Sequence, residues 1–166
     1  DPCAAGRVRD LMNGAADERE LVRGWLEAVS RAGVRAELEA VFAAAAEAIA
    51  FARRNFSVEL DYSDGSIAHI ESIMENFDRN TSGRGLPRAE VLAQFGRMFG
   101  SYVGEVYRKN HGGAWGMISN DGNSIPGVQG ANGILFWPWA RVENRMRQGP
   151  EESVLDYYLH LMGPAQ

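Results

Sequence analysis

The stretch FGRMFGSYVGEVYRKNH, Phe95 to His111, carries glycine at every fourth position of one helical segment. Residues four apart lie on one face of an α-helix, so Gly96, Gly100 and Gly104 form a single stripe. A glycine inside a helix costs about 0.8–1 kcal/mol relative to alanine, so this stripe costs roughly 2.5–3 kcal/mol in total. That cost is large for a small domain, and we therefore expect another part of the molecule to pack very close to this backbone.

The apolar side chains of the same helix lie beside the glycine stripe. Phe95, Phe99 and Val106 belong to this apolar face. The helix is therefore predicted to contact two layers, one through side chains and one through its backbone. The expected neighbour of the stripe is either the strand that follows Gly112 or a helix packed across it. At Gly104, the open space could hold protein or a ligand.

The composition is that of an ordinary globular protein. The chain has 166 residues, of which 45% are hydrophobic and 23% charged, and its net charge is −5. Because nucleic acids bind to concentrated positive charge, we predict no nucleic-acid partner. Lys109 is the only lysine among 17 basic residues, and this arginine bias, with the abundant alanine and glycine, indicates a GC-rich bacterial genome.

No segment is suited to crossing a membrane. The longest apolar run, Ala40 to Ala52, is interrupted by Glu47 and is too short to span a bilayer. We expect a soluble, most simply cytoplasmic, protein with no membrane partner. The sequence does not begin with methionine, which leaves a removed signal peptide as an alternative. Cys3 is the only cysteine, so no intrachain disulfide forms.

The N-terminal third is predicted to be helical after an irregular start. Residues 1–16 mix glycine, proline and charged residues without a period, which predicts a loose arm. Residues 17–163 are then expected to form a single domain, of which 17–55 is an antiparallel helical pair interrupted at Gly33. The second helix of the pair, about 35–55, carries Val41, Phe42 and Ala45 on one face.

The core of the predicted domain, 57–163, begins with a short extended segment that two helices follow. Residues 57–61 alternate in polarity, which predicts a short half-exposed strand or extended segment. Ser63 is suited to be the N-cap of a third helix, and Pro87 to be the first residue of a fourth helix that runs to about Asn110.

After Gly113, the periodicity of the apolar residues changes from that of a helix to that of a strand. The residues from Ala114 to Ser119 alternate, and Asp121-Gly122 and Asn132-Gly133 are turn signals that predict a three-stranded meander. Pro138 and Pro150 each begin a further helix. The fold class is therefore α+β, with helices packed on a small three- or four-stranded antiparallel sheet.

Five short motifs occur in order along the second part of the chain. They are LDYSxxSI at Leu60–Ile67, GxYxGEV at Gly100–Val106, GGxW at Gly112–Trp115, WPWARV at Trp137–Val142 and GxExSV at Gly149–Val154. Over roughly residues 57–162, this order resembles an uncharacterised bacterial family, a domain of unknown function. The resemblance implies a shared fold, but no activity and no catalytic residues.

The sequence offers no cofactor or metal site. The glycines from Gly127 to Gly133 superficially resemble a phosphate loop, but an apolar strand follows them where a helix N-terminus would be required. His69, His111 and His160 are scattered, without the spacing of metal ligands. We identify no catalytic nucleophile signature and predict neither cofactor nor metal.

The strongest candidate for a ligand site surrounds Glu105. With Arg108, Tyr102 and Trp115, this carboxylate could line a pocket mouth as a base or a ligand anchor. The alternative is an ion pair within the helix, between Glu105 and Arg108 or Lys109.

Two functions follow from these observations. The first is a non-enzymatic binding or protein-interaction module with an unidentified protein partner and an undetermined oligomeric state. The second is a small-molecule-binding protein or enzyme with a pocket near Glu105 and Trp115. A deep cleft at Glu105 would favour the second, and a filled interior with an exposed apolar patch would favour the first.

Overall fold

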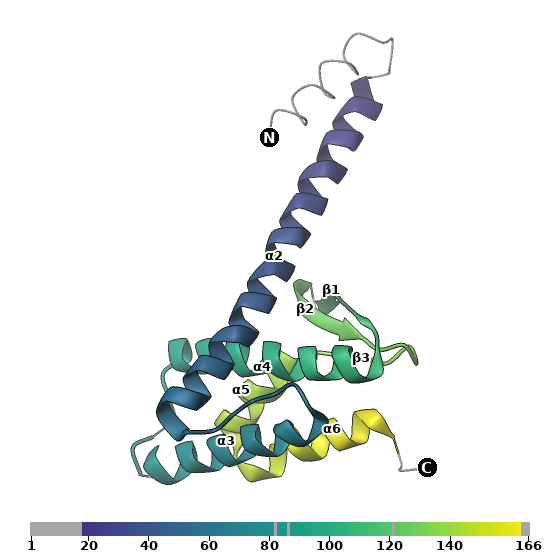
Figure 1. The fold of residues 1–166 in the computed structure, drawn as a ribbon. Coiled ribbons are helices and arrows are strands. Elements are labelled where there is room, and N and C mark those ends of the chain that lie inside the picture. The colour runs from purple at the N-terminus through teal and green to yellow at the C-terminus, as the bar shows by residue number, and fades with distance from the viewer. Residues whose placement is uncertain (1–17, 82, 86, 121, 164–166) are drawn as a thin grey trace. The chain divides into compact units, whose positions relative to one another are not determined.

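The protein is described from a computed structural model, drawn in Figure 1. The structure describes residues 18–81, 83–85, 87–120 and 122–163. The chain forms two compact units, Asp1–Ala36 and Glu37–Gln166, and each is described by itself. The division falls within 17–163, the range that the sequence predicts to be one domain. The arm predicted for residues 1–16 lies outside the described residues.

Helix α2 runs without interruption from Glu18 to Phe56. The antiparallel pair predicted over 17–55 is therefore wrong, because the helix continues through Gly33. Glycine keeps its backbone N–H and can adopt helical dihedral angles, so it weakens a helix by about 1 kcal/mol without having to end it. Neither Ala32 nor Val34 beside it adds a turn signal.

In the second unit, α2 buries small side chains. The buried residues at helical spacing are Val41, Ala44, Ala45, Ala48 and Ala52. Phe42 was predicted to share this face, yet its side chain is 46% exposed. Further along, the ring of Phe51 packs edge-on against Phe95 and Phe99 of the central helix, at centroid distances of 5.4 and 5.9 Å. The alanines let α2 approach its neighbours closely, while Phe51 provides most of its aromatic packing.

A segment without regular structure connects α2 to the next helices. Residues 57–61 join no strand, although their burial alternates as the sequence predicts, with Leu60 buried. The 3₁₀ turn η1, Asp64–Ser66, leads into α3, Ile67–Thr81. Ser63 stands before η1 without a capping side-chain bond, and its hydroxyl donates to Asp61 Oδ1 at 2.6 Å.

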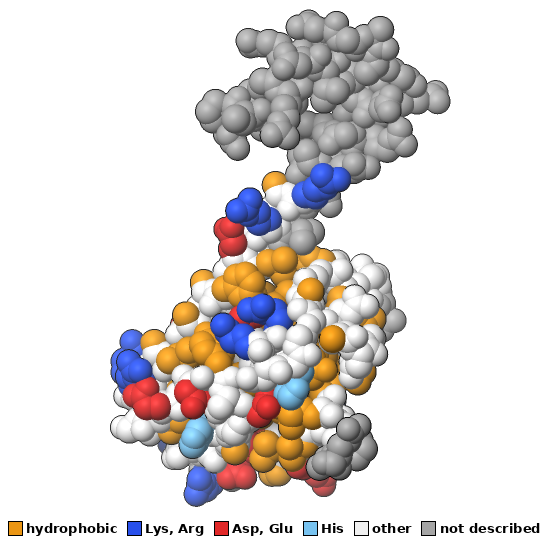
Figure 2. All heavy atoms as spheres, turned by 45° about the vertical axis from the view of Figure 1, so that its right-hand side comes forward, with side chains coloured by type: hydrophobic (Ala, Val, Ile, Leu, Met, Phe, Trp, Pro, Cys, Tyr) orange, Lys and Arg blue, Asp and Glu red, His pale blue; other side chains and the backbone are white. Residues whose placement is uncertain are grey.

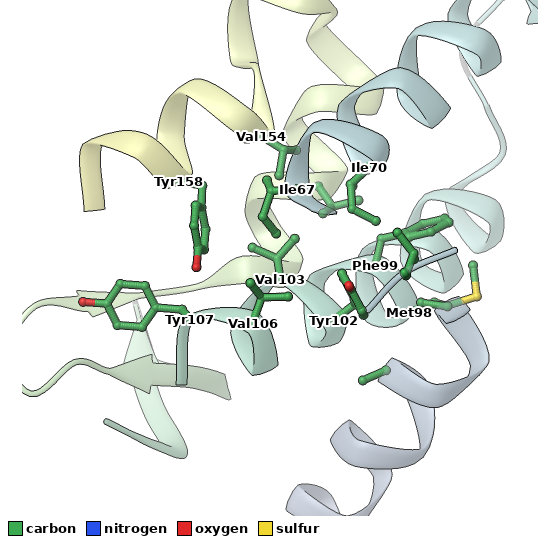
Figure 3. Close-up of a cluster of buried hydrophobic side chains, with 14 of the residues drawn as sticks. Ile67, Ile70, Met98, Phe99, Tyr102, Val103, Val106, Tyr107, Val154 and Tyr158 are labelled. Atoms are coloured by element: carbon green, nitrogen blue, oxygen red, sulfur yellow. The ribbon is translucent and has the colours of Figure 1, made fainter. Parts of the chain in front are cut away.

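Helix α4, Ala89–His111, lies at the centre of the second unit. It begins two residues after Pro87, the predicted start. All its residues from Met98 to Tyr107 are buried. Figure 3 shows the apolar cluster on one side of α4, where Ile67 of α3 lies between Val103 and Val154 of the C-terminal helix.

The predicted meander is confirmed. Strands β1, Ala114–Asn120, and β2, Asn123–Gln129, form an antiparallel hairpin in which Asn120 lies opposite Asn123. Strand β3, Leu135–Phe136, pairs with the far edge of β2. The strand order is β1-β2-β3, and with the helices around it this sheet gives the α+β class predicted from the sequence.

Three short elements complete the chain. Helix α5, Pro138–Gln148, begins at the predicted proline and ends before Gly149, whose φ of 98° suits glycine. Pro150 begins the 3₁₀ turn η2, Pro150–Glu152, and not the last helix as predicted. That helix, α6, Val154–Met162, begins after Ser153, whose side chain accepts a hydrogen bond from the Asp156 amide.

Candidate functional site

Glu105 is a buried carboxylate whose hydrogen bonds are made within the protein. Glu105 is 4% exposed and lies on the buried stretch of α4. Arg108 donates to both carboxylate oxygens, from Nε at 2.7 Å and Nη2 at 3.0 Å. The indole Nε1 of Trp115 donates to Oε1 at 2.8 Å. The carboxylate is therefore held by a bidentate arginine from its own helix and by the first strand.

The electrostatics keep Glu105 ionised. Burial by itself raises the pKa of this carboxyl, but the hydrogen bonds from Arg108 and Trp115 and the nearby positive charges outweigh it, so the pKa of Glu105 lies below its ordinary value. The same pairing raises the pKa of Arg108. A general base working near neutral pH requires a raised carboxyl pKa, and Glu105 departs in the opposite direction.

The space beside Gly104 is filled by Trp115. A Cβ atom on Gly104 would lie 2.2 and 2.4 Å from Cζ2 and Cη2 of the indole, and 3.1 Å from Cγ of Pro138. The ring of Trp115 therefore lies directly against the α4 backbone, one residue before the carboxylate that its Nε1 contacts. The sequence allows either protein or a ligand beside Gly104, and in the structure protein atoms occupy this space.

The other two glycines of the stripe face α5. A Cβ on Gly100 would lie 2.6 Å from Cα and 2.7 Å from N of Trp139, so backbone meets backbone there. At Gly96 the nearest atom is Cγ of Glu143, at 2.5 Å, with the Trp139 carbonyl oxygen at 3.1 Å. The stripe thus faces both neighbours that the sequence offered, a helix across Gly96 and Gly100 and a strand residue at Gly104.

Tyr102 does not belong to the group around Glu105. Its residue is fully buried, and its hydroxyl accepts a hydrogen bond from the Tyr62 amide at 2.9 Å and bonds to Ser66 Oγ at 2.7 Å. Its ring stacks on Tyr62 at a centroid distance of 5.1 Å. Burial raises the pKa of Tyr102. The structure therefore brings three of the four candidate ligand residues together, while Tyr102 fastens the segment before η1 to α4.

Sequence reasoning missed a buried ionic cluster centred on Arg145. This arginine is 0% exposed, and it donates from Nε to Glu71 at 2.6 Å and from Nη1 to Asp78 at 2.7 Å. Glu71 also accepts the Val154 amide at 2.8 Å. Helical spacing places Arg145 on one face with Arg141 and Gln148, which predicts a solvated face or, second, a partner patch. The full burial of Arg145 shows that this prediction is wrong for that residue. The available signal was Glu71, a carboxylate between Ile70 and Met74 on the apolar face of α3.

A second polar group joins three distant elements through Asp64. Its Oδ1 accepts a hydrogen bond from the Tyr158 hydroxyl at 2.5 Å and lies 3.0 Å from His111 Nε2. Burial and the Asp64 carboxylate both raise the pKa of Tyr158. His111, the last residue of α4, therefore pairs across the fold. Among the described residues, no group of three or more His, Cys, Asp or Glu side chains could hold a metal ion.

The surface above Glu105 carries aromatic and basic side chains together. The Arg108 guanidinium lies over the Phe42 ring at 5.9 Å, and the Lys109 ammonium lies over the Tyr62 ring at 4.8 Å. We call these four residues, Phe42, Tyr62, Arg108 and Lys109, the Phe42 face. In Figure 2, a group of basic side chains near the middle of the view has hydrophobic side chains above it and to its left.

A hollow of about 510 Å³ lies elsewhere, at the C-terminal ends of α3 and α5. Asp78 and Thr81 line it from α3, and Met146 and Arg147 from α5. None of the four residues predicted to bind a ligand lines this hollow. Over the part of the chain that is described, no helix has the length and apolarity needed to cross a membrane.

Comparison with known proteins identifies the fold and no more. No protein-family model and no curated protein matches the chain. A crystal structure at 1.50 Å resolution of a protein from Bacteroides thetaiotaomicron VPI-5482 is similar, with a TM-score of 0.56 and 12% sequence identity. The match covers 77% of this chain and 44% of that one, so this chain spans less than half of the other protein's length. At this identity the likeness indicates a shared fold.

Proposed function

We propose that the unit Glu37–Gln166 is a non-enzymatic protein-interaction module that contacts its partner through the Phe42 face. The observation that carries this proposal is the arrangement at Arg108. The buried Glu105 carboxylate binds this guanidinium in a bidentate pair. The guanidinium also lies over the ring of Phe42, a residue that is 46% exposed. An exposed aromatic ring held by a fixed arginine is typical of the anchors of protein interfaces.

The neighbouring pair strengthens this surface. Lys109 lies over Tyr62, whose backbone carbonyl accepts a hydrogen bond from Asn110 at 2.8 Å and whose ring stacks on the buried Tyr102. The Tyr62 ring is thus held in place before a partner arrives, which lowers the entropic cost of binding. Arginine and aromatic residues are also the types enriched at interface cores.

The geometry gives the alternative function less support. A small-molecule site at Glu105 and Trp115 would require free polar groups and space, yet the carboxylate is engaged by Arg108 and Trp115, and the indole fills the position beside Gly104. The net charge of −5 supports a partner other than nucleic acid. We place the module in the cytoplasm and, on its motifs, in the uncharacterised bacterial family that the sequence resembles.

The test compares variants of the Phe42 face with a matched exposed site. Phe42→Glu and Lys109→Glu are expected to reduce capture of a cross-linked partner by about tenfold or more, because each removes a contact at the centre of the surface. Leu159→Glu is the control, since Leu159 is 49% exposed on α6 and outside this face. Thermal melts of all three should match the wild type.

Two results would contradict the proposal. One is that Phe42→Glu and Leu159→Glu capture the same cross-linked partners to the same extent. The other is a metabolite that stabilises the wild type in a melt screen and loses its effect in Trp115→Phe, a result that would favour the small-molecule alternative.

A further inference from the structure

Strand β1 has an open edge. In the order β1-β2-β3 it pairs on one side with β2, and among the described residues its other side pairs with no strand. Its sequence, AWGMISN, contains neither a charged residue nor a proline. Natural sheet edges usually carry such residues to prevent pairing with another chain, and β1 lacks them.

The position of Pro126 determines which backbone groups of β1 face the open edge. Residues of an antiparallel pair alternate between those that exchange both hydrogen bonds with the opposite residue and those whose N–H and C=O point away. Pro126, which lies opposite Met117, has no N–H and cannot belong to the first kind. The N–H and C=O groups of Trp115, Met117 and Ser119 therefore point outward.

These outward groups are self-complementary. A twofold axis at Met117 places Met117 opposite its copy and Trp115 opposite Ser119 of the second chain, which satisfies all three residues with about six backbone hydrogen bonds. No like charges meet, because β1 carries none. In this register Gly116 faces Ile118 of the second copy, and a Cβ on Gly116 would find no atom within 4 Å, so the isoleucine has room.

From these observations we infer that β1 pairs antiparallel with β1 of a second copy of this chain, joining two three-stranded sheets into one continuous sheet. The occupant of the edge is a second copy because the register satisfies the outward groups symmetrically and opposes no charges. This inference does not rest on the partner proposed for the Phe42 face. Phe42→Glu should leave the self-association unchanged. The experiments can therefore show separately whether this inference or the proposed function fails.

The experiment places charges on the axis. Sedimentation velocity of the wild type over a concentration series should show a monomer–dimer equilibrium. Met117→Lys and Met117→Glu should each raise the dimer dissociation constant by about fivefold or more, because like charges then face each other. An equimolar mixture of the two variants should recover dimer. Ser119→Lys, the matched control, adds the same charge to β1 at a position that faces Trp115, so it should weaken the dimer less.

A second measurement keeps the test decisive if a variant folds poorly. In the wild type, amide exchange at Trp115, Met117 and Ser119 should slow as the protein concentration rises, while exchange at Gly116 and Ile118 should not change. A wild type that remains monomeric at its highest soluble concentration would overturn the inference. So would a dimer that both Met117 variants leave intact, and failure of the mixture to recover dimer would exclude the register.

Discussion

At the scale of single residues, Glu105 shows how a candidate functional group can be fully occupied by structure. Its carboxylate accepts three hydrogen bonds from two side chains. Of these two side chains, Arg108 is the one that reaches the surface. A buried carboxylate is stable only when such partners offset the loss of water. The group therefore ties strand β1 to helix α4 and positions Arg108 on the surface.

Glu105→Gln should lower the free energy of unfolding by about 1.5–3 kcal/mol at neutral pH, because hydrogen bonds to a charged acceptor are lost. The pKa of Glu105 is lowered in the folded protein, so its contribution to stability is fully present above the unfolded value near 4.5 and is lost as the pH falls through the folded pKa. Urea unfolding of both proteins from pH 7 to pH 3 measures this difference, which should shrink on the acid side. A difference that stays constant over this range would contradict the assignment.

At the scale of elements, the glycine stripe sets how closely α4 and α5 approach. At Gly100 the obstacle is the backbone of Trp139, whereas at Gly96 it is mainly the flexible side chain of Glu143. A backbone cannot move aside as a side chain can, so the two positions should differ in their tolerance of a methyl group.

Gly100→Ala should destabilise the protein by about 1–3 kcal/mol through overpacking, although alanine is the better helix former. Gly96→Ala should cost less. The control is Gly33→Ala in α2, where no atom lies within 4 Å of the added Cβ, so it should increase helicity or leave it unchanged. Thermal melts and circular dichroism of the three variants measure this order, and a harmless Gly100→Ala would rule out close packing as the purpose of the stripe.

The cluster around Arg145 joins α3, α5 and the start of α6. Arg145→Met should destabilise by about 3–5 kcal/mol, because Glu71 then remains buried without its countercharge. The double variant Arg145→Met with Glu71→Leu should recover part of this loss, since it removes the buried pair together. It leaves Asp78, whose side chain is 32% exposed, and the Val154 amide without these partners. Chemical denaturation of the two variants tests the pairing, and an equal loss in both would mean that packing alone accounts for the effect.

At the scale of the whole molecule, local patterns were sufficient for the elements that local signals determine. The meander, with its two turns, and the start of α5 at Pro138 follow from alternation and from turn residues. Gly33 was misinterpreted as a break because a single glycine weakens a helix without ending it. The pairs of Arg145 with Glu71 and of His111 with Asp64 join residues far apart in the chain, and no local spacing indicates such partners.

The candidate site was predictable only in part, for the same reason. Glu105 and Arg108 are three residues apart on one helix, so their pairing was a stated alternative. That Trp115 would cover Gly104 depends on how the hairpin folds back onto α4, which the spacing does not reveal. Tyr102 is predicted to lie with Glu105, but its hydroxyl bonds to the Tyr62 amide before η1 and to Ser66 of η1.

The cation that lies over Tyr62 has a chemical consequence of its own. Lys109 is the only lysine in the sequence. Every side-chain primary amine of this chain is therefore found at one position, on the Phe42 face. An amine-reactive fluorophore or surface linker would label that position selectively among the side chains, and an enzyme that acetylates lysine would have a single target there, where it would remove the positive charge above the Tyr62 ring.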